Sequence, residues 1–256
     1  SGKIKEIFTN PKADLSGVSI NPDDYHIEAV TTEYIRKEWT AIDPAFQKDL
    51  DAMKKLAGEK RFGVVNRTSD GTKWVVAVGG PASPAKYYLY DRSAGSFTLL
   101  VETRKKLKKY KLAAKTPVII KARDGLELVC YLTKPVRPFP GKQPMVLFVH
   151  GGPWARDKYA YTPMVQWLSN RGYVVLEVNF RGSSGFGKKF LNAGNKEWGR
   201  KMQHDLTDSV AWAIKNANVD PKRVGIMGGA YGGYATLAGV VFTPDLYAAA
   251  VHIVGP

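Results

Sequence analysis

A glycine-lined turn between an apolar strand and a helix is the feature of this sequence that most limits its fold. The apolar run Val224–Met227 leads into Gly228-Gly229-Ala230-Tyr231-Gly232-Gly233, and a helix is expected to begin at Tyr231. A strand that turns at once into a helix brings two backbones almost into contact, which only residues without side chains permit. We therefore expect Gly228 and Gly232 to lie where the strand and the helix cross.

The residue between these two glycines is expected to be strained, with its side chain pointing outward. The layout is that of a nucleophile elbow, Gly-x-Ser-x-Gly, with Ala230 in the serine position. A methyl group cannot attack a carbonyl, so we expect the chain as written to be inactive. Glycine-rich turns before a helix also bind phosphates. Here, however, no Gly-Lys-Ser/Thr follows, and the glycine spacing does not fit the dinucleotide fingerprint.

A second glycine-rich loop, His150-Gly151-Gly152-Pro153, follows the apolar strand Met145–Val149. In hydrolases with an elbow, such a loop lends a backbone N–H to the oxyanion hole. Glycine lets that N–H approach the developing negative charge without a side chain in the way. We assign this role to the N–H of Gly152 and interpret the imidazole of His150 as structural.

A third motif, Asn179-Phe180-Arg181-Gly182-Ser183-Ser184-Gly185-Phe186-Gly187, lies between the other two. The three motifs in this order closely resemble the prolyl oligopeptidase family of serine peptidases, and the acylaminoacyl-peptidase-like branch is the nearest. The resemblance covers Pro117–Pro256 well and the preceding residues more loosely. Three motifs in order are far more specific than any one alone.

The resemblance implies a reaction and a site. A serine in the Ala230 position would attack a peptide or ester carbonyl, a histidine would take its proton, and an aspartate would orient that histidine. The N–H groups of Gly152 and Tyr231 would stabilise the oxyanion. The family therefore implies hydrolysis of short peptides, N-acylated ones included, by a Ser-Asp-His triad.

The acid and the base of that triad are not found in this sequence. In elbow hydrolases they follow the nucleophile along the chain, and the candidates after Ala230 are Asp245 and His252. We reject both, because Asp245 ends the elbow helix and His252 lies inside an expected core strand. Family triad positions lie on loops after later strands.

Three interpretations of function stay open: a serine peptidase, a carboxylesterase with the same machinery, and a pseudoenzyme that binds peptides without cleaving them. The residues around Ala230 are intact, which favours an introduced serine-to-alanine change over natural loss.

Residues 1–108 predict the C-terminal part of a β-propeller. They show short strands with turn signals about every ten residues, and four of these strands resemble one propeller blade. A helix is expected after Asp43, which caps it, and before Gly58. The expected strands are 3–8, 17–20, 26–31, 33–39, 62–67, 73–79, 86–91 and 96–101.

Residues 109–256 predict the N-terminal part of an α/β-hydrolase catalytic domain, that is, a mostly parallel sheet with helices on both faces, incomplete here. After a hairpin over 118–132, strands and helices alternate. The expected strands are 145–149, 173–179, 223–227 and 248–254, and the expected helices are 160–171, 203–217 and 231–241.

The last strand, 248–254, has the apolar character of a central strand with both faces covered, and we expect its edge to be open in this sequence, which ends at Pro256. An open apolar edge favours aggregation. We therefore expect an apolar surface beside this strand, to be covered by a missing C-terminal segment or a second chain. A homo-oligomer is an alternative partner.

Charge, motifs and residue spacing argue against several partners and cofactors. The net charge of +15 permits binding to nucleic acid, but the densest cluster, Arg104–Lys109, has no nucleic-acid motif and is interpreted as a linker. Cys130 is alone, so no internal disulfide forms. No run is long enough to span a membrane, and no residues have metal-ligand spacing. We expect no nucleic acid, membrane, metal or cofactor, and favour the cytoplasm over the periplasm or secretion.

Overall fold

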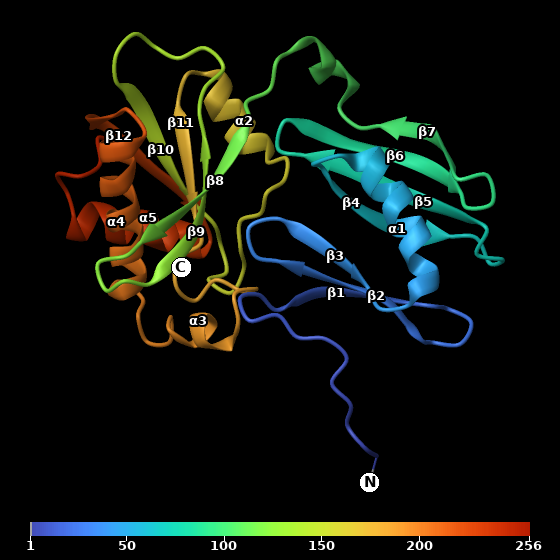
Figure 1. Cartoon of the computed structure of the whole chain (residues 1–256). Helices are drawn as coiled ribbons and strands as arrows, with labels where there is room; N and C mark the ends of the chain where they lie inside the picture. Colours follow the sequence, from blue (N-terminus) through green and yellow to red (C-terminus); the bar gives the residue numbers. More distant parts are fainter. Residues whose placement is uncertain (1) are drawn as a thin grey trace.

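The computed structural model describes residues 2–256 and has two lobes that lie side by side (Figure 1). The β lobe, residues 15–102, holds two antiparallel sheets and a helix. Its elements are β1 (Leu15–Ile20), β2 (Ile27–Glu33), β3 (Lys37–Ala41), α1 (Pro44–Ala57), β4 (Arg61–Arg67), β5 (Lys73–Gly80), β6 (Ser83–Asp91) and β7 (Ser96–Glu102).

The α/β lobe, residues 115–253, holds one mixed sheet and its covering helices (Figure 1). Its elements are β8 (Lys115–Lys121), β9 (Glu127–Thr133), β10 (Gln143–Val149), α2 (Pro163–Asn170), β11 (Val174–Val178), α3 (Lys188–Asn192), α4 (Lys201–Asn216), β12 (Val219–Gly229), α5 (Tyr231–Phe242) and β13 (Ala249–Ile253). The 3₁₀ helix η1 (Lys105–Lys109) lies between the lobes, and the predicted boundary between residues 108 and 109 falls inside it.

The β lobe is built on a four-stranded antiparallel sheet in the order β4-β5-β6-β7, the unit that the turn signals predicted as one propeller blade. A separate three-stranded sheet has the order β1-β2-β3. The helix begins where it was predicted, because the side chain of Asp43 accepts a hydrogen bond from Ala45 N. The core is aromatic, with successive ring centroids 4.4–6.3 Å apart in Trp39, Phe46, Phe62, Trp74, Tyr90 and Phe97.

The sheet of the α/β lobe has the strand order β13-β12-β10-β11-β9-β8. Strands β10 to β13 are parallel, and β8 and β9 form an antiparallel hairpin along one side. On one face, Val146 and Val175 pack with Val165 of α2. On the other face, Leu147 packs in the same cluster as Leu206 of α4 and residues of α5. Both faces are covered, which explains why β10 and β11 are apolar without alternation.

Two elements differ from the sequence-based expectation. Residues 3–8 form no strand, and Ile4 is fully exposed, because an alternating pattern makes a strand only where a partner strand is available. Helix α3 was not predicted, since its five residues are too few to show a period. The expected strand 248–254 is present as β13, and it has the expected open edge at one side of the sheet.

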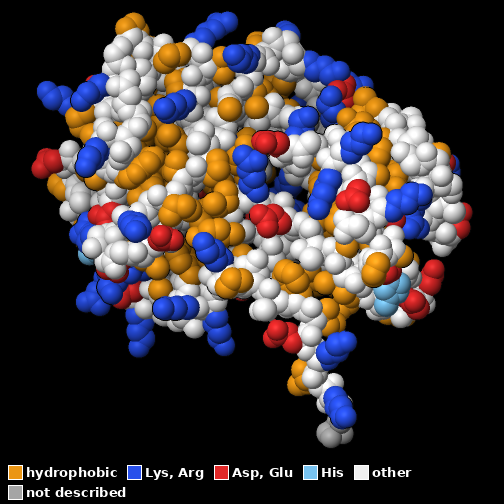
Figure 2. Space-filling model, viewed as in Figure 1, with side chains coloured by type: hydrophobic (Ala, Val, Ile, Leu, Met, Phe, Trp, Pro, Cys, Tyr) orange, Lys and Arg blue, Asp and Glu red, His pale blue; other side chains and the backbone are white. Residues whose placement is uncertain are grey.

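Strand β13 is exposed along its length, and the predicted apolar surface is present beside it. Val251 and Ile253 are 49% and 40% exposed, and Val241 and Phe242 of α5 are 69% and 59% exposed. Figure 2 shows hydrophobic side chains gathered over the α/β lobe. What covers this surface stays a prediction.

Cys130 lies in the middle of β9, with no exposed surface. Burial raises the pKa of its thiol far above the ordinary value. The side chain is therefore an inert part of the core, as the sequence indicated. Within residues 2–256, no helix combines the length and apolar character needed to cross a membrane.

Candidate active site

Ala230 occupies the turn between β12 and α5 in a backbone conformation that residues other than glycine rarely adopt. Its φ is 50° and its ψ is −120°. Its N–H donates to Ile253 O at 3.0 Å, and its carbonyl accepts from Tyr234 N at 3.1 Å. Ala230 is exposed. The strain and the exposure are those of an elbow that presents one side chain at the surface.

The crossing of strand and helix leaves no space for side chains at Gly228 and Gly232. A Cβ on Gly228 would lie 2.5 Å from the backbone of Gly232, and a Cβ on Gly232 would overlap the carbonyl oxygen of Val149. Real Cβ atoms essentially never come within 3.0 Å of another heavy atom. The predicted role of these two glycines is therefore confirmed.

The loop that follows β10 lies directly against this turn. A Cβ on Gly151 would be 3.5 Å from Ala230 Cβ and 3.2 Å from Gly229 O. Gly152 has a φ of 123°, and a Cβ there would lie 2.6 Å from Trp154 N. The structure thus brings the predicted residues Gly152 and Ala230 to one place, and Gly152 needs glycine both for its φ and for its space.

Two N–H groups beside Ala230 are available to a ligand. Neither Gly152 N nor Tyr231 N donates a hydrogen bond to another residue of the described chain. Tyr231 is the first residue of α5, where a helix leaves its N–H groups unpaired. Free donors are what an oxyanion hole requires. The assignment of Gly152 and Tyr231 to that role stays a prediction.

The imidazole ring of His150 contacts the backbone of its own loop and the loop after β11. Its Nδ1 lies 2.7 Å from Gly151 O, and its Nε2 lies 2.9 Å from the Oγ of Ser183. The ring stacks on Phe180 with centroids 4.5 Å apart. Burial lowers the pKa of His150 to about 4, so the imidazole is neutral at pH 7. These contacts agree with the structural role inferred from the sequence.

Aromatic rings hold Tyr231 in place. Its ring is 5.2 Å from that of Phe180, 4.7 Å from that of Trp198 and 5.7 Å from that of Tyr234. The ring of Tyr231 is 1% exposed, whereas Trp198 is 40% exposed. A fixed ring fixes the backbone that carries it, so the N–H of Tyr231 points in a set direction.

Arg181 anchors the loop after β11 through two ion pairs, one of them buried on both sides. Its guanidinium contacts Asp205 at 2.7 Å and Asp124 at 2.8 Å, and its backbone N–H donates to Asp205. The side chain of Asp205 has no exposed surface. Arg181 holds the pKa of Asp124 at about 2. Because Ser183 follows two residues later, these ion pairs also place the hydroxyl that contacts His150.

Arg156, which follows the loop His150–Pro153 after β10, connects this part of the chain to the β lobe. Its guanidinium donates to the carbonyl oxygens of Glu33 and Tyr34, the latter at 2.8 Å. The hydroxyl of Tyr131 donates to the next carbonyl, Ile35 O, at 2.7 Å. Three consecutive carbonyls of the β2–β3 turn are thus bound by the α/β lobe.

Sequence reasoning missed the roles of Arg156 and Arg181. One signal was available for Arg156, since Gly185 and Phe186 in the third motif both accommodate it. A Cβ on Gly185 would lie 3.0 Å from the guanidinium, which stacks over Phe186 at 4.2 Å. No local signal shows that Arg181 pairs with Asp205, because the two residues are far apart in sequence.

The rejected candidates lie away from any catalytic arrangement. Asp245 is exposed in the turn after α5. His252 lies on the exposed edge strand β13, rather than in the core, and its Nε2 accepts from Gly255 N at 3.0 Å. No hydrogen bond joins either side chain to Ala230 in the part of the chain that the structure describes. Their rejection as triad members stays a prediction.

No group of three or more His, Cys, Asp and Glu side chains suited to a metal ion occurs within residues 2–256. Asp205 and Asp208 both lie inside α4, and each pairs with an arginine, Asp208 with Arg123 at 2.7 Å.

Comparison with known proteins agrees with this geometry. Residues 159–256 match the model of the prolyl oligopeptidase family. Over its whole length the chain is 47% identical to "Dipeptidyl aminopeptidase BIII" of Pseudoxanthomonas mexicana.

The chain is similar to the prolyl oligopeptidase family.

A second family relative, "Dipeptidyl peptidase family member 6" of Caenorhabditis elegans, is 39% identical over 98% of the chain. The acylaminoacyl peptidase of Pyrococcus horikoshii superposes with a TM-score of 0.72 at 23% identity, over 95% of this chain and 38% of that one. The predicted fold class, part of a propeller followed by part of an α/β hydrolase, is confirmed. The chain spans 38% and 37% of the length of the two curated relatives.

Proposed function

We propose that this chain carries the nucleophile elbow and the oxyanion loop of a serine peptidase that hydrolyses short peptides, N-acylated ones included. Ala230 stands in the position of the nucleophile. The observation that carries the proposal is the strained, exposed conformation of Ala230 beside the unpaired N–H groups of Gly152 and Tyr231.

The chemistry follows from that geometry. A serine hydroxyl in place of the Ala230 methyl would attack a peptide carbonyl that lies against the turn. The carbonyl oxygen would become an oxyanion, and the N–H groups of Gly152 and Tyr231 would stabilise it. The N-terminus of α5 adds a partial positive charge at the same place. Loss of one such donor typically slows turnover roughly 100- to 1,000-fold.

The substrate class rests on the relatives. Two of them are named for dipeptide release, and the structural neighbour is named an acylaminoacyl peptidase. These names share action at one end of a peptide, which supports short peptides as the substrate. They differ in whether that end is free or acylated.

The first test restores the nucleophile in the chain as it stands. A chain with alanine in this position is expected to turn over about a million-fold more slowly than one with an active serine. Because we find no base among residues 1–256, Ala230→Ser should not react rapidly with a fluorophosphonate probe. Rapid labelling would place the base inside this chain and contradict the triad argument.

The second test uses Ala230→Ser in a chain extended to the length of the relatives. We expect it to cleave a peptide anilide and an acetyl-amino-acid anilide, and Ala230 itself serves as the inactive control. Turnover of a simple ester without either amide would identify a carboxylesterase. A folded protein that binds these peptides but cleaves none would be a peptide-binding pseudoenzyme.

A further inference from the structure

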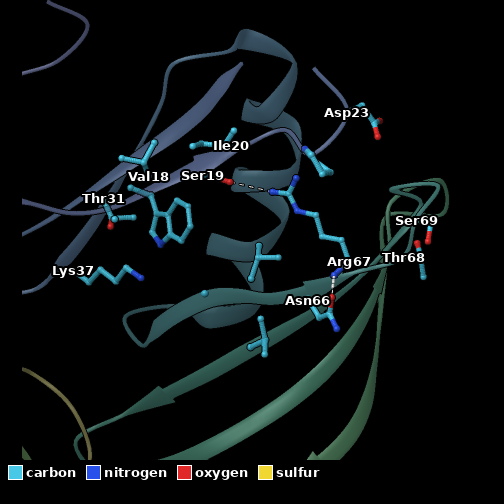
Figure 3. Close-up of a pocket in the computed structure, with 16 residues that line it drawn as sticks. Val18, Ser19, Ile20, Asp23, Thr31, Lys37, Asn66, Arg67, Thr68 and Ser69 are labelled. Carbon is cyan, nitrogen blue, oxygen red and sulfur yellow. Dashed lines mark hydrogen bonds between the residues drawn. The ribbon is translucent and has the colours of Figure 1, made fainter. Parts of the chain in front are cut away.

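Three cavities meet at one lysine where the two sheets of the β lobe approach the oxyanion loop. Their volumes are about 590, 540 and 490 Å³, and Lys37 of β3 lines all three. Figure 3 shows the first of them, with Lys37 on one side and Arg67 of β4 on the opposite side. Ala160 and Tyr161, which follow the oxyanion loop, line the second.

Lys37 has no partner for its charge. Within residues 2–256 its ammonium makes no hydrogen bond and no ion pair. It lies over the face of Trp39, with Nζ 5.0 Å from the ring centroid. Burial lowers the pKa of Lys37, the nearby charge of Arg61 adds to that effect, and the carboxylate of Glu33 opposes it. A bound anion would favour the charged form of Lys37 in the same way as Glu33 does.

A second unpaired cation faces the same cavity. The guanidinium of Arg104 lies 5.5 Å from the ring centroid of Tyr161 and forms no ion pair with any described residue. Its backbone φ of 51° is in the left-handed region, which is unfavourable for an arginine. Arg61 also lines this cavity, but its charge is already paired with Glu33.

The balance of charge separates this cavity from its neighbours. The 540 Å³ cavity is lined by three cations and no Asp or Glu, whereas Asp23 lines the first cavity and Glu38 and Glu59 line the third. Figure 2 shows Lys and Arg side chains at the hollow between the lobes. An ammonium group such as a free peptide N-terminus would be repelled here.

Most of the remaining lining is apolar. Strands β4 and β5 contribute Phe62, Val64, Ala77 and Val78, and the hydroxyl-bearing residues Ser83 and Thr103 complete it. A ligand that matches both features has an apolar body and one negative charge.

We propose that this cavity binds the carboxylate of a short peptide, with Lys37 and Arg104 as its charge partners and the apolar residues of β4 and β5 under the neighbouring residues. This inference rests on the proposed peptidase function and names its substrate class as peptides that carry a carboxylate. The carboxylate belongs to the C-terminus or to an acidic side chain. Charge-assisted hydrogen bonds from two cations recognise either form.

The test compares three peptides that differ only in their charge. They are acetyl-Phe-Ala-Ala with a free carboxylate, the same peptide as its carboxamide, and acetyl-Phe-Ala-Glu carboxamide. Binding to the 256-residue chain is measured by calorimetry, since Ala230 prevents turnover. The indole N–H resonance of Trp39 locates the bound peptide. We expect the free carboxylate to bind about ten-fold or more tightly than the carboxamide, and the glutamate peptide shows whether a side chain serves equally.

Variants assign the effect to Lys37. Lys37→Met should bring the carboxylate peptide down to the affinity of the carboxamide, and Lys37→Arg should keep most of the difference. Lys121→Met, which removes an exposed lysine from β8, is the matched control and should change nothing.

Each other outcome overturns the proposal. Equal affinity for carboxylate and carboxamide would show that no carboxylate is recognised, while the peptidase proposal would stand. An unchanged carboxylate preference in Lys37→Met would remove Lys37 from the site. Failure of all three peptides to bind would overturn this inference alone, because the turnover assay of the extended chain decides the proposed function separately.

Discussion

The two lobes hold their structure in different ways. Two ion pairs of the α/β lobe are buried on both sides, Arg181 with Asp205 (4% and 0% exposed) and Lys115 with Glu177 (1% and 1%). In the β lobe, Asp49 is buried but its partner Arg92 reaches solvent (5% and 38%). Buried pairs tolerate the loss of a partner poorly. We therefore expect the α/β lobe to lose more stability than the β lobe when one partner of such a pair is removed.

The strictest test of that difference exchanges one glycine in each lobe. Gly232→Ala would press a methyl into the Val149 carbonyl, and we expect it to destabilise the α/β lobe by about 4 kcal/mol or more. Gly63→Ala in β4 meets only the end of Lys37, 3.8 Å away, and should change stability by less than about 0.5 kcal/mol. Urea unfolding measures both. Similar losses in the two variants would contradict the comparison.

A smaller effect is expected when one arginine is removed from each lobe. Arg181→Met leaves the charge of Asp205 buried and unpaired, which should cost about 3–4 kcal/mol. Arg92→Met leaves Asp49 with the hydroxyl of Tyr90 and with access to water along the vacated side chain, so we expect about 1 kcal/mol. Thermal and urea unfolding of each variant checks the order. If Arg92→Met were the more costly, burial of both partners would not be what distinguishes the lobes.

The smallest effect concerns two histidines whose pKa values shift in opposite directions. In the β lobe, Asp24 and Asp43 raise the pKa of exposed His26, so its contribution is present below about pH 6.5 and is lost as pH rises through the raised value. In the α/β lobe, burial lowers the pKa of His150 to about 4. The contribution of His150 to the free energy of unfolding is therefore fully present above about pH 6.5 and is lost as pH falls towards 4.

The two histidines are separated by NMR titration and by melting temperatures. The difference in melting temperature between the unsubstituted chain and the His26→Gln variant should shrink at alkaline pH. His150 should show no protonation between pH 7 and pH 5. Titration of both rings near pH 6.5 would mean that neither environment acts on its histidine.

The sequence predicted the local features of the fold and missed those that depend on distant partners. The elbow was found because the crossing of strand and helix requires glycine at two nearby positions, and α1 was found because Asp43 caps it. The strand at 3–8 was wrong, since alternation alone cannot supply a neighbouring strand.

The site shows the same limit. Ala230, Gly152 and Tyr231 could be proposed from short motifs. The buried partners of Arg181 and the carbonyls held by Arg156 could not be found, because they come from segments that only the folded chain brings together.

The burial of Cys130 has a practical consequence, because thiol reagents cannot reach the one cysteine of the sequence. The chain contains one cysteine, and that thiol is fully buried on β9. An Ala230→Cys variant would therefore carry a single thiol that reagents can reach. This thiol would lie at the N-terminus of α5, where the pKa of a thiol is lowered. Its alkylation rate as a function of pH would report the electrostatic field at the elbow directly, without any substrate.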